Sequence, residues 1–290
     1  MIIDMHYHID ERMEPMDRLT SQMDQHGIDR IVLIAPMVDP FHVAGGAAKL
    51  AALARKMLTG RGYRIGLMMY ESTVTKNGRF SVLGDKYDIY SEPDNSLVEK
   101  AMAAHPDRFW GWFFINPSVE DSLFRLESEM AADGWIGVKC HPFWHRYAVS
   151  RLDDAAAWCA EKNRPLLIHL GGKKDNGDFR YLPERHPKLR IIYAHAGLPH
   201  YKRLWDYIQD RDNLYVDLSS PYLNKPLRLQ ALHALGPEKC MYGTDGPFGY
   251  PAEDGKYDHG AILSEIRKFP ISAAAQEKIL GKNFMAAAGL

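Results

Sequence analysis

The chain has 290 residues, enough for one large α/β barrel or two ordinary domains, and its 46% hydrophobic and 25% charged residues are typical of a soluble globular protein. The formal net charge of −1 provides no basic field that would favour nucleic acid or an anionic membrane as a partner. We therefore expect a small-molecule substrate, with no nucleic acid and no membrane involved.

Three cysteines, Cys140, Cys159 and Cys240, lie inside or beside apolar runs. Their small, odd number is typical of buried thiols in a reducing compartment rather than of a disulfide framework. The first apolar strand begins at Met1 without the basic segment and cleavage site of a signal peptide, and no run approaches the length of a membrane span. We therefore expect a cytoplasmic protein.

The first apolar run ends in two histidines, His6 and His8. Side chains two residues apart on a strand point to the same side, so the two imidazoles are expected to converge on one point. Such a pair can chelate a metal ion such as Zn²⁺ if further ligands arrive from elsewhere, but alone it is weak evidence. The ends of the later strands therefore decide whether a metal site exists.

Apolar runs and helical patterns alternate along the rest of the chain. After the first strand, a helix is expected at 15–25, with Gly27 as its stop, followed by a strand at 31–35. Further strands are expected at 109–115, 136–140, 166–170, 191–195, 214–218 and 240–243. Helices are expected at 96–104, 119–132 (capped by Ser118), 153–162, 183–186, 200–209, 227–235, 260–268 and 273–288.

A long segment, 37–95, interrupts this alternation. It contains an Ala-rich helical pattern at about 47–58, and an alternating stretch, 72–82, around Asn77-Gly78, which is a strong hairpin signal. Because the segment leaves from the C-terminal end of a strand, it should emerge on the catalytic side of a barrel. We expect it to cover the site or to form a subunit contact, and we expect a homo-oligomer, with a dimer favoured.

Eight strands alternating with helices predict a parallel (β/α)₈ TIM barrel with a helix-plus-hairpin insertion after the second strand. No linker, charge block or repeat marks a boundary, so residues 1–290 are expected to form a single domain. A doubly wound sheet in two halves is the alternative, although Gly171-Gly172 is not followed by the pattern of a phosphate-binding turn.

Polar residues follow several apolar runs, at the strand ends where a barrel carries its active site. They are His6 and His8 on the first strand, Lys139 and His141 on the fourth, His169 on the fifth, His195 on the sixth and Asp245 on the eighth. Random placement of 13 histidines would put most of them on surfaces and in turns. Five at strand ends therefore indicate a metal site or a catalytic site.

The motifs IIDMHYH, GVKCHP, PLLIHLGG, RIIYAHAG, YVDLS and MYGTDGP, with the ending KILGKNFMAAAGL, run from the first residues to the last. In order and spacing they resemble the amidohydrolase superfamily, in the amidohydrolase-related branch that includes aminocarboxymuconate-semialdehyde decarboxylase. The resemblance implies that His6, His8, His169 and Asp245 bind one divalent metal ion, usually Zn²⁺. It also implies that His195 acts on the substrate, and Asp245 is placed to receive a proton from water.

Several other polar residues have open roles. Lysines at the position of Lys139 bridge two metal ions elsewhere in the superfamily, but Lys139 and His141 share a strand face and either could instead contact substrate or have no function. Arg180, in the loop after the fifth strand, could bind a substrate carboxylate, although a solvated loop is the simpler interpretation. Asp217 and Ser219 are expected to serve as hydrogen-bonding structure.

Three functions fit these residues. The first is a metal-dependent hydrolase that uses water activated by the metal to cleave a C–O or C–N bond, as in a lactone or an amide, of a small, carboxylate-bearing substrate. The second is a metal-dependent non-oxidative decarboxylase of an unsaturated or aromatic acid, which would use the same ligands. The third is a metal-free barrel used for binding, with its histidines satisfied by hydrogen bonds.

Overall fold

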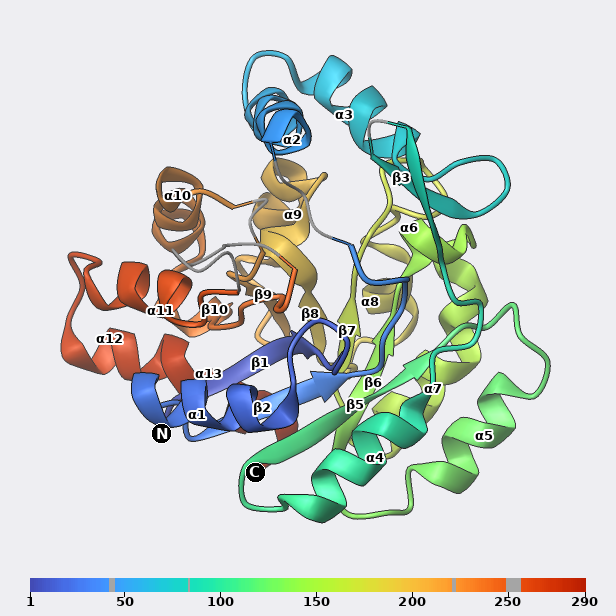
Figure 1. Ribbon diagram of the computed structural model, residues 1–290, viewed down its shortest axis with the longest axis vertical. Helices are drawn as coiled ribbons and strands as arrows, with labels where there is room; N and C mark the ends of the chain where they lie inside the picture. Colours follow the sequence, from blue (N-terminus) through green and yellow to red (C-terminus); the bar gives the residue numbers. More distant parts are fainter. Residues whose placement is uncertain (42–44, 83, 221–222, 249–256) are drawn as a thin grey trace.

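The computed structural model describes residues 1–41, 45–82, 84–220, 223–248 and 257–290 (Figure 1). Its main sheet has eight strands that neighbour one another in chain order, and every pair within it is parallel. The strands are β1 Ile3–His8, β2 Arg30–Ile34, β5 Phe109–Ile115, β6 Trp135–Cys140, β7 Leu166–Ile168, β8 Ile191–Tyr193, β9 Leu214–Asp217 and β10 Cys240–Met241. The predicted (β/α)₈ barrel is confirmed.

Backbone hydrogen bonds between the first strand and the residues that follow β10 close the barrel. The amide of Met5 donates to the carbonyl of Tyr242 (3.2 Å), and the amide of Asp245 donates to the carbonyl of His6 (2.7 Å). The amide of His8 donates to the carbonyl of Gly246 (2.6 Å). The closure therefore fixes His6, His8 and Asp245 beside one another through their own backbone.

Helices surround the barrel (Figure 1). They are α1 Met16–His26, α4 Asn95–Ala104, α5 Ser122–Glu129, α6 Pro142–His145, α7 Asp153–Glu161, α8 Tyr181–Arg185, α9 Tyr201–Ile208, α10 Lys225–Leu235, α11 Gly260–Arg267, α12 Ala273–Glu277 and α13 Asn283–Ala288. Short 3₁₀ turns lie at Val149–Leu152, Ala194–Gly197 and Pro237–Lys239. No helix in the described ranges has the length and apolar character needed to cross a membrane.

Two predicted helices differ from the observed ones. The helix expected at 119–132 is shorter, because Asp121, with φ 59°, occupies the N-cap position and Ser118 instead donates its amide to Asn116 Oδ1. The helix expected at 273–288 is interrupted by a π-helical turn, Lys278–Lys282. Gly281 lies in that turn, where a Cβ atom would come within 2.5 Å of the carbonyl oxygen of Met1.

The segment between β2 and α4 contains two helices, α2 Gly45–Leu58 and α3 Tyr63–Ser72, and an antiparallel pair, β3 Arg79–Val82 and β4 Asp85–Asp88. Asn77-Gly78 does form a turn, with the amide of Gly78 bonded to the carbonyl of Thr75 at 3.0 Å. The predicted hairpin around this turn is present but short: Val74 bridges Phe80, the amide of Thr75 donates to the carbonyl of Arg79 (2.8 Å), and the amide of Ser81 donates to the carbonyl of Thr73 (2.7 Å). Its first arm begins only after α3 ends at Ser72, and its second arm, β3, also pairs with β4, which the sequence did not predict.

The sequence did not predict α3, because Gly66 interrupts its helical pattern. Gly66 is required there, since a Cβ atom at this position would lie 2.2 Å from the backbone N of Leu58 on α2. The two helices therefore pack closely at this point, backbone against backbone. In Figure 1 they lie in the upper part of the view, while α4 and α5 lie in the lower part.

Candidate metal centre

His6 lies on β1 with its side chain fully buried. Its Nδ1 is 2.8 Å from Oδ2 of Asp217, the last residue of β9. The other oxygen of Asp217, Oδ1, accepts from the amide of His195 (2.9 Å), from the amide of Ser219 (3.0 Å) and from the hydroxyl of Ser219 (2.5 Å). A carboxylate only accepts hydrogen bonds, so Nδ1 of His6 carries the proton and Nε2 keeps its lone pair.

Asp245 follows β10 and faces three imidazole nitrogens. Its Oδ1 is 3.4 Å from Nε2 of His6 and 3.6 Å from Nε2 of His8, and its Oδ2 is 3.9 Å from Nε2 of His195. Burial raises the pKa of the Asp245 carboxyl group, whereas the positive charge of Lys139 lowers it. A cation beside this carboxylate therefore stabilises its ionised form.

His195 lies immediately after β8 in a strained turn. Both His195 and Ala196 have φ 54°, in the left-handed region that non-glycine residues rarely adopt, and such strain is concentrated at functional sites. Nδ1 of His195 is 2.9 Å from Oγ of Ser219. Because the Ser219 hydroxyl already donates to Asp217, Nδ1 of His195 is the donor and Nε2 carries the lone pair.

His169, after β7, connects the site to the insertion. Its Nδ1 is 3.1 Å from Nε2 of His195, and its Nε2 is 2.8 Å from the hydroxyl of Tyr70 on α3. The Tyr70 ring stacks on Phe143 with a centroid distance of 4.2 Å, which helps to hold its hydroxyl in place. Sequence reasoning missed Tyr70, because no local pattern marks a contact between residues 99 positions apart.

The fourth-strand candidates Lys139 and His141 also lie in the site. Nζ of Lys139 is fully buried, 3.4 Å from Nε2 of His6, and burial lowers the pKa of this lysine to about 8. The His141 ring stacks on His169 with a centroid distance of 4.0 Å, and its Nδ1 accepts from the amide of Trp144. Lys139 thus contacts one of the candidate ligands, His6, directly.

Arg180 does not join this group. Its side chain is exposed, and its guanidinium lies 5.1 Å from the centre of the Tyr207 ring on α9. This placement gives no support to a role in binding substrate, and agrees with the simpler interpretation of a solvated loop.

The nitrogen and oxygen atoms of the cluster fit a divalent metal ion. One ligand atom from each of His6, His195 and Asp245 lies within 4.8 Å of the others, the one such cluster found among the described residues. Nε2 of His8 also faces the Asp245 carboxylate, at 3.6 Å from Oδ1. The ligand set expected from the sequence is His6, His8, His169 and Asp245, with His195 outside it. The cluster in the structure contains His195, which follows β8, in place of His169, which follows β7.

Burial also keeps the imidazoles neutral, which is the form that binds a metal. Desolvation lowers the pKa values of His6, His169 and His195 well below the ordinary value, and lowers the pKa of His8 to about 3. Each can therefore offer a lone pair at neutral pH. The hydrogen bond from His6 to Asp217 is the kind of outer contact that fixes a ligand's tautomer in metal sites.

Comparison with known families agrees with the fold. The model of the amidohydrolase family matches residues 3–284, so the chain belongs to the amidohydrolases, a family of metal-dependent enzymes. A search of curated protein sequences found no match.

Solved structures share the fold at low sequence identity. A putative 2-pyrone-4,6-dicarboxylic acid hydrolase from Pseudomonas putida is 18% identical, with a TM-score of 0.60, covering 99% of this chain and 97% of that one. A 4-oxalomesaconate hydratase from Rhodopseudomonas palustris is 14% identical, with a TM-score of 0.62, covering 100% and 96%. A dihydroxybenzoic acid decarboxylase from Polaromonas sp. JS666, with bound manganese and 2-nitroresorcinol, is 16% identical, with a TM-score of 0.59, covering 100% and 97%. This chain thus has the same fold as enzymes of several chemistries.

Proposed function

We propose that the protein is a metal-dependent hydrolase that uses water activated by the metal to cleave a C–O or C–N bond, as in a lactone or an amide. The substrate is a small molecule that bears a carboxylate. The observation that carries this proposal is the convergence of His6, His8 and His195 on the carboxylate of Asp245. Catalytic metal sites use such mixed nitrogen and oxygen ligands and keep one position for water or substrate.

We propose one divalent ion, Zn²⁺, held by His6, His8, His169 and Asp245. Imidazole and carboxylate ligands suit Zn²⁺, and the tautomer of His6 that Asp217 fixes points Nε2 at the site. When bound, the ion polarises a carbonyl oxygen and makes water more acidic. For His169 to take part, its ring must exchange the hydrogen bond to Tyr70 or to His195 for the metal.

The chain's own residues supply the proton transfers. Asp245, whose pKa burial raises, can accept a proton from the attacking water. His195 lies beside it, with Nδ1 donating to Ser219, so its Nε2 can accept a hydrogen bond that orients the substrate, or take up the proton released from water and pass it to the leaving group. The ammonium of Lys139, 3.4 Å from His6, provides positive charge for an anionic substrate group. The ring of His141 stacks on the ring of His169 and so limits the space beside His169.

A metal-dependent decarboxylase of an unsaturated or aromatic acid is the second candidate. It is favoured by the fold shared with the dihydroxybenzoic acid decarboxylase, and by the buried Lys139, which can bind a substrate carboxylate. Both candidates use the same ligands, so the ligands alone do not separate them.

Two experiments test the proposal. Metal content per chain should be about one equivalent in the wild-type protein and close to zero in His6→Ala, and negligible metal in both would refute the metal site. The metal-loaded enzyme should then be assayed on cyclic esters, amides and hydroxylated aromatic acids. Hydrolysis without CO₂ release supports the first candidate, whereas CO₂ release from an aromatic acid assigns the second.

A further inference from the structure

The insertion helices α2 and α3 expose an unusual amount of apolar surface. Eight large hydrophobic residues are exposed in the part of the chain that the structure describes, and four of them lie on these two helices. They are Leu50 (39% exposed), Leu53 (51%), Ile65 (54%) and Met68 (71%). Apolar side chains gathered in this way mark an interaction site more often than single ones do.

The same surface carries only positive charge. Its exposed charged residues between 49 and 68 are Lys49, Lys56, Arg61 and Arg64. None of these four forms an ion pair within the described ranges. The one acidic residue of the two helices, Glu71, accepts a hydrogen bond on Oε1 from the amide of Gly172 at 2.5 Å. We name this surface, exposed residues 49–68, the basic face.

A surface of opposite character lies on and around α5. Its exposed acidic residues are Glu120, Asp121, Glu127, Glu129 and Asp133. Phe124, 69% exposed, stands in the middle of this stretch. The only cation between 120 and 133, Arg125, is already paired with Glu92 and Glu129. We name the exposed residues 120–133 the acidic face.

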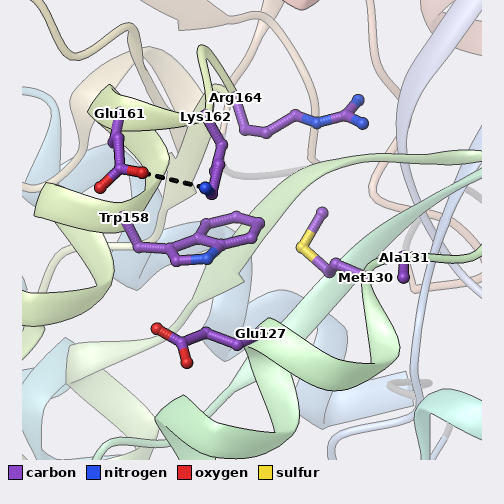
Figure 2. A pocket seen from close by; sticks show the side chains of 7 residues that line it. All are labelled: Glu127, Met130, Ala131, Trp158, Glu161, Lys162 and Arg164. Atoms are coloured by element: carbon purple, nitrogen blue, oxygen red, sulfur yellow. Dashed lines mark hydrogen bonds and ion pairs between the residues drawn. The ribbon is translucent and has the colours of Figure 1, made fainter.

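A groove of about 550 Å³ borders the acidic face between α5 and α7. Figure 2 shows the Trp158 ring lying between the side chains of Glu127 and Lys162, with Met130 beside it. Lys162 is itself paired with Glu161 at 2.9 Å, and Arg164, which also lines the groove, donates to the carbonyl oxygen of Trp135 at 3.0 Å. Glu127, on α5, is the acidic side chain of the groove that forms no ion pair within the described ranges. An aromatic surface beside a carboxylate suits the stem and the charge of an arginine or lysine side chain.

We infer that the basic face of one copy of this chain docks on the acidic face of a second copy. Each face combines exposed apolar side chains with charged side chains of one sign, and the charges of the two faces are opposite. The two faces lie at opposite ends of the molecule, so one chain cannot join its own faces (Figure 1). Two basic faces would repel one another, so the contact pairs different surfaces of the two copies. Because α3 also carries Tyr70, this contact would lie on the helix that reaches the metal centre.

Charge reversal tests this contact directly. Arg61→Glu with Arg64→Glu reverses the basic face, and Glu127→Lys with Asp133→Lys reverses the acidic face. Sedimentation velocity should show wild-type assembly at about 0.1 M salt that weakens at about 1 M salt, where the Debye length falls from about 10 Å to about 3 Å. Each double variant should raise the dissociation constant by about a hundredfold or more, and the chain carrying all four changes should assemble again.

A control matched to the basic-face reversal, Lys225→Glu with Lys268→Glu, makes the same negative change in net charge as Arg61→Glu with Arg64→Glu, at exposed positions outside both faces, and should assemble like the wild type. A monomeric wild-type protein at high concentration and low salt would overturn the inference. So would assembly unaffected by both reversals, or a fourfold variant that stays monomeric. Wild-type protein that remains monomeric but binds vesicles of phosphatidylserine would assign the basic face to a lipid surface instead.

Discussion

Asp217→Asn should weaken metal binding although Asp217 is not expected to touch the metal. Three of its four hydrogen-bond donors use Oδ1, and only His6 uses Oδ2. The asparagine will therefore keep its oxygen in the Oδ1 position and turn its NH₂ group toward Nδ1 of His6. A donor facing Nδ1 favours the tautomer of His6 that is protonated on Nε2, which removes the lone pair aimed at the metal site.

The expected cost follows from this single contact. To bind metal, His6 must return to its original tautomer and lose the new hydrogen bond to residue 217. Loss of such an outer contact weakens metal affinity by about 10–100-fold, which is about 1.4–2.7 kcal/mol. Competition with a chromogenic chelator measures the Zn²⁺ affinity of the variant, of the wild type and of a control, Asp212→Asn, at an exposed residue of the preceding loop. A folded Asp217→Asn protein with wild-type affinity would refute the assigned tautomer.

Three further predictions concern neighbouring groups. His195→Asn should retain about one metal ion per chain while kcat falls by about 10²–10⁴-fold, and loss of metal would make His195 a ligand. Tyr70→Phe should change the ring ¹⁵N shifts of His169 and the metal affinity, whereas Tyr63→Phe on the same helix should change neither. The three cysteines are buried with pKa values raised by desolvation, so a thiol reagent should modify them only after unfolding.

The sequence predicted the barrel well because each strand is a short apolar run bounded by turns, and these runs alternate with helical patterns along the whole chain. His6, His8 and Asp245 could be placed together because parallel strands end at one side of a barrel. Asp217 and Ser219 make the hydrogen bonds expected of them.

What the sequence could not provide were contacts that depend on three-dimensional packing. Tyr70 reaches His169 only because α3 packs back over the end of β7, and no periodicity encodes that return. Arg180 was a candidate because it lies in the loop after the fifth predicted strand, but its guanidinium lies over the ring of Tyr207 on α9. The turn signal at Asn77-Gly78 located a short hairpin, but it could not show that β3 would also pair with β4 on its other side along the chain.

Anomalous diffraction at the zinc absorption edge, from crystals of the Zn²⁺-loaded protein, tests the central claim most directly. We predict one strong peak per chain, in contact with His6, His8, His169 and Asp245, with His195 outside the coordination sphere. Absence of a peak at the barrel mouth, or a peak bound by His195 in place of His169, would contradict the proposed metal centre.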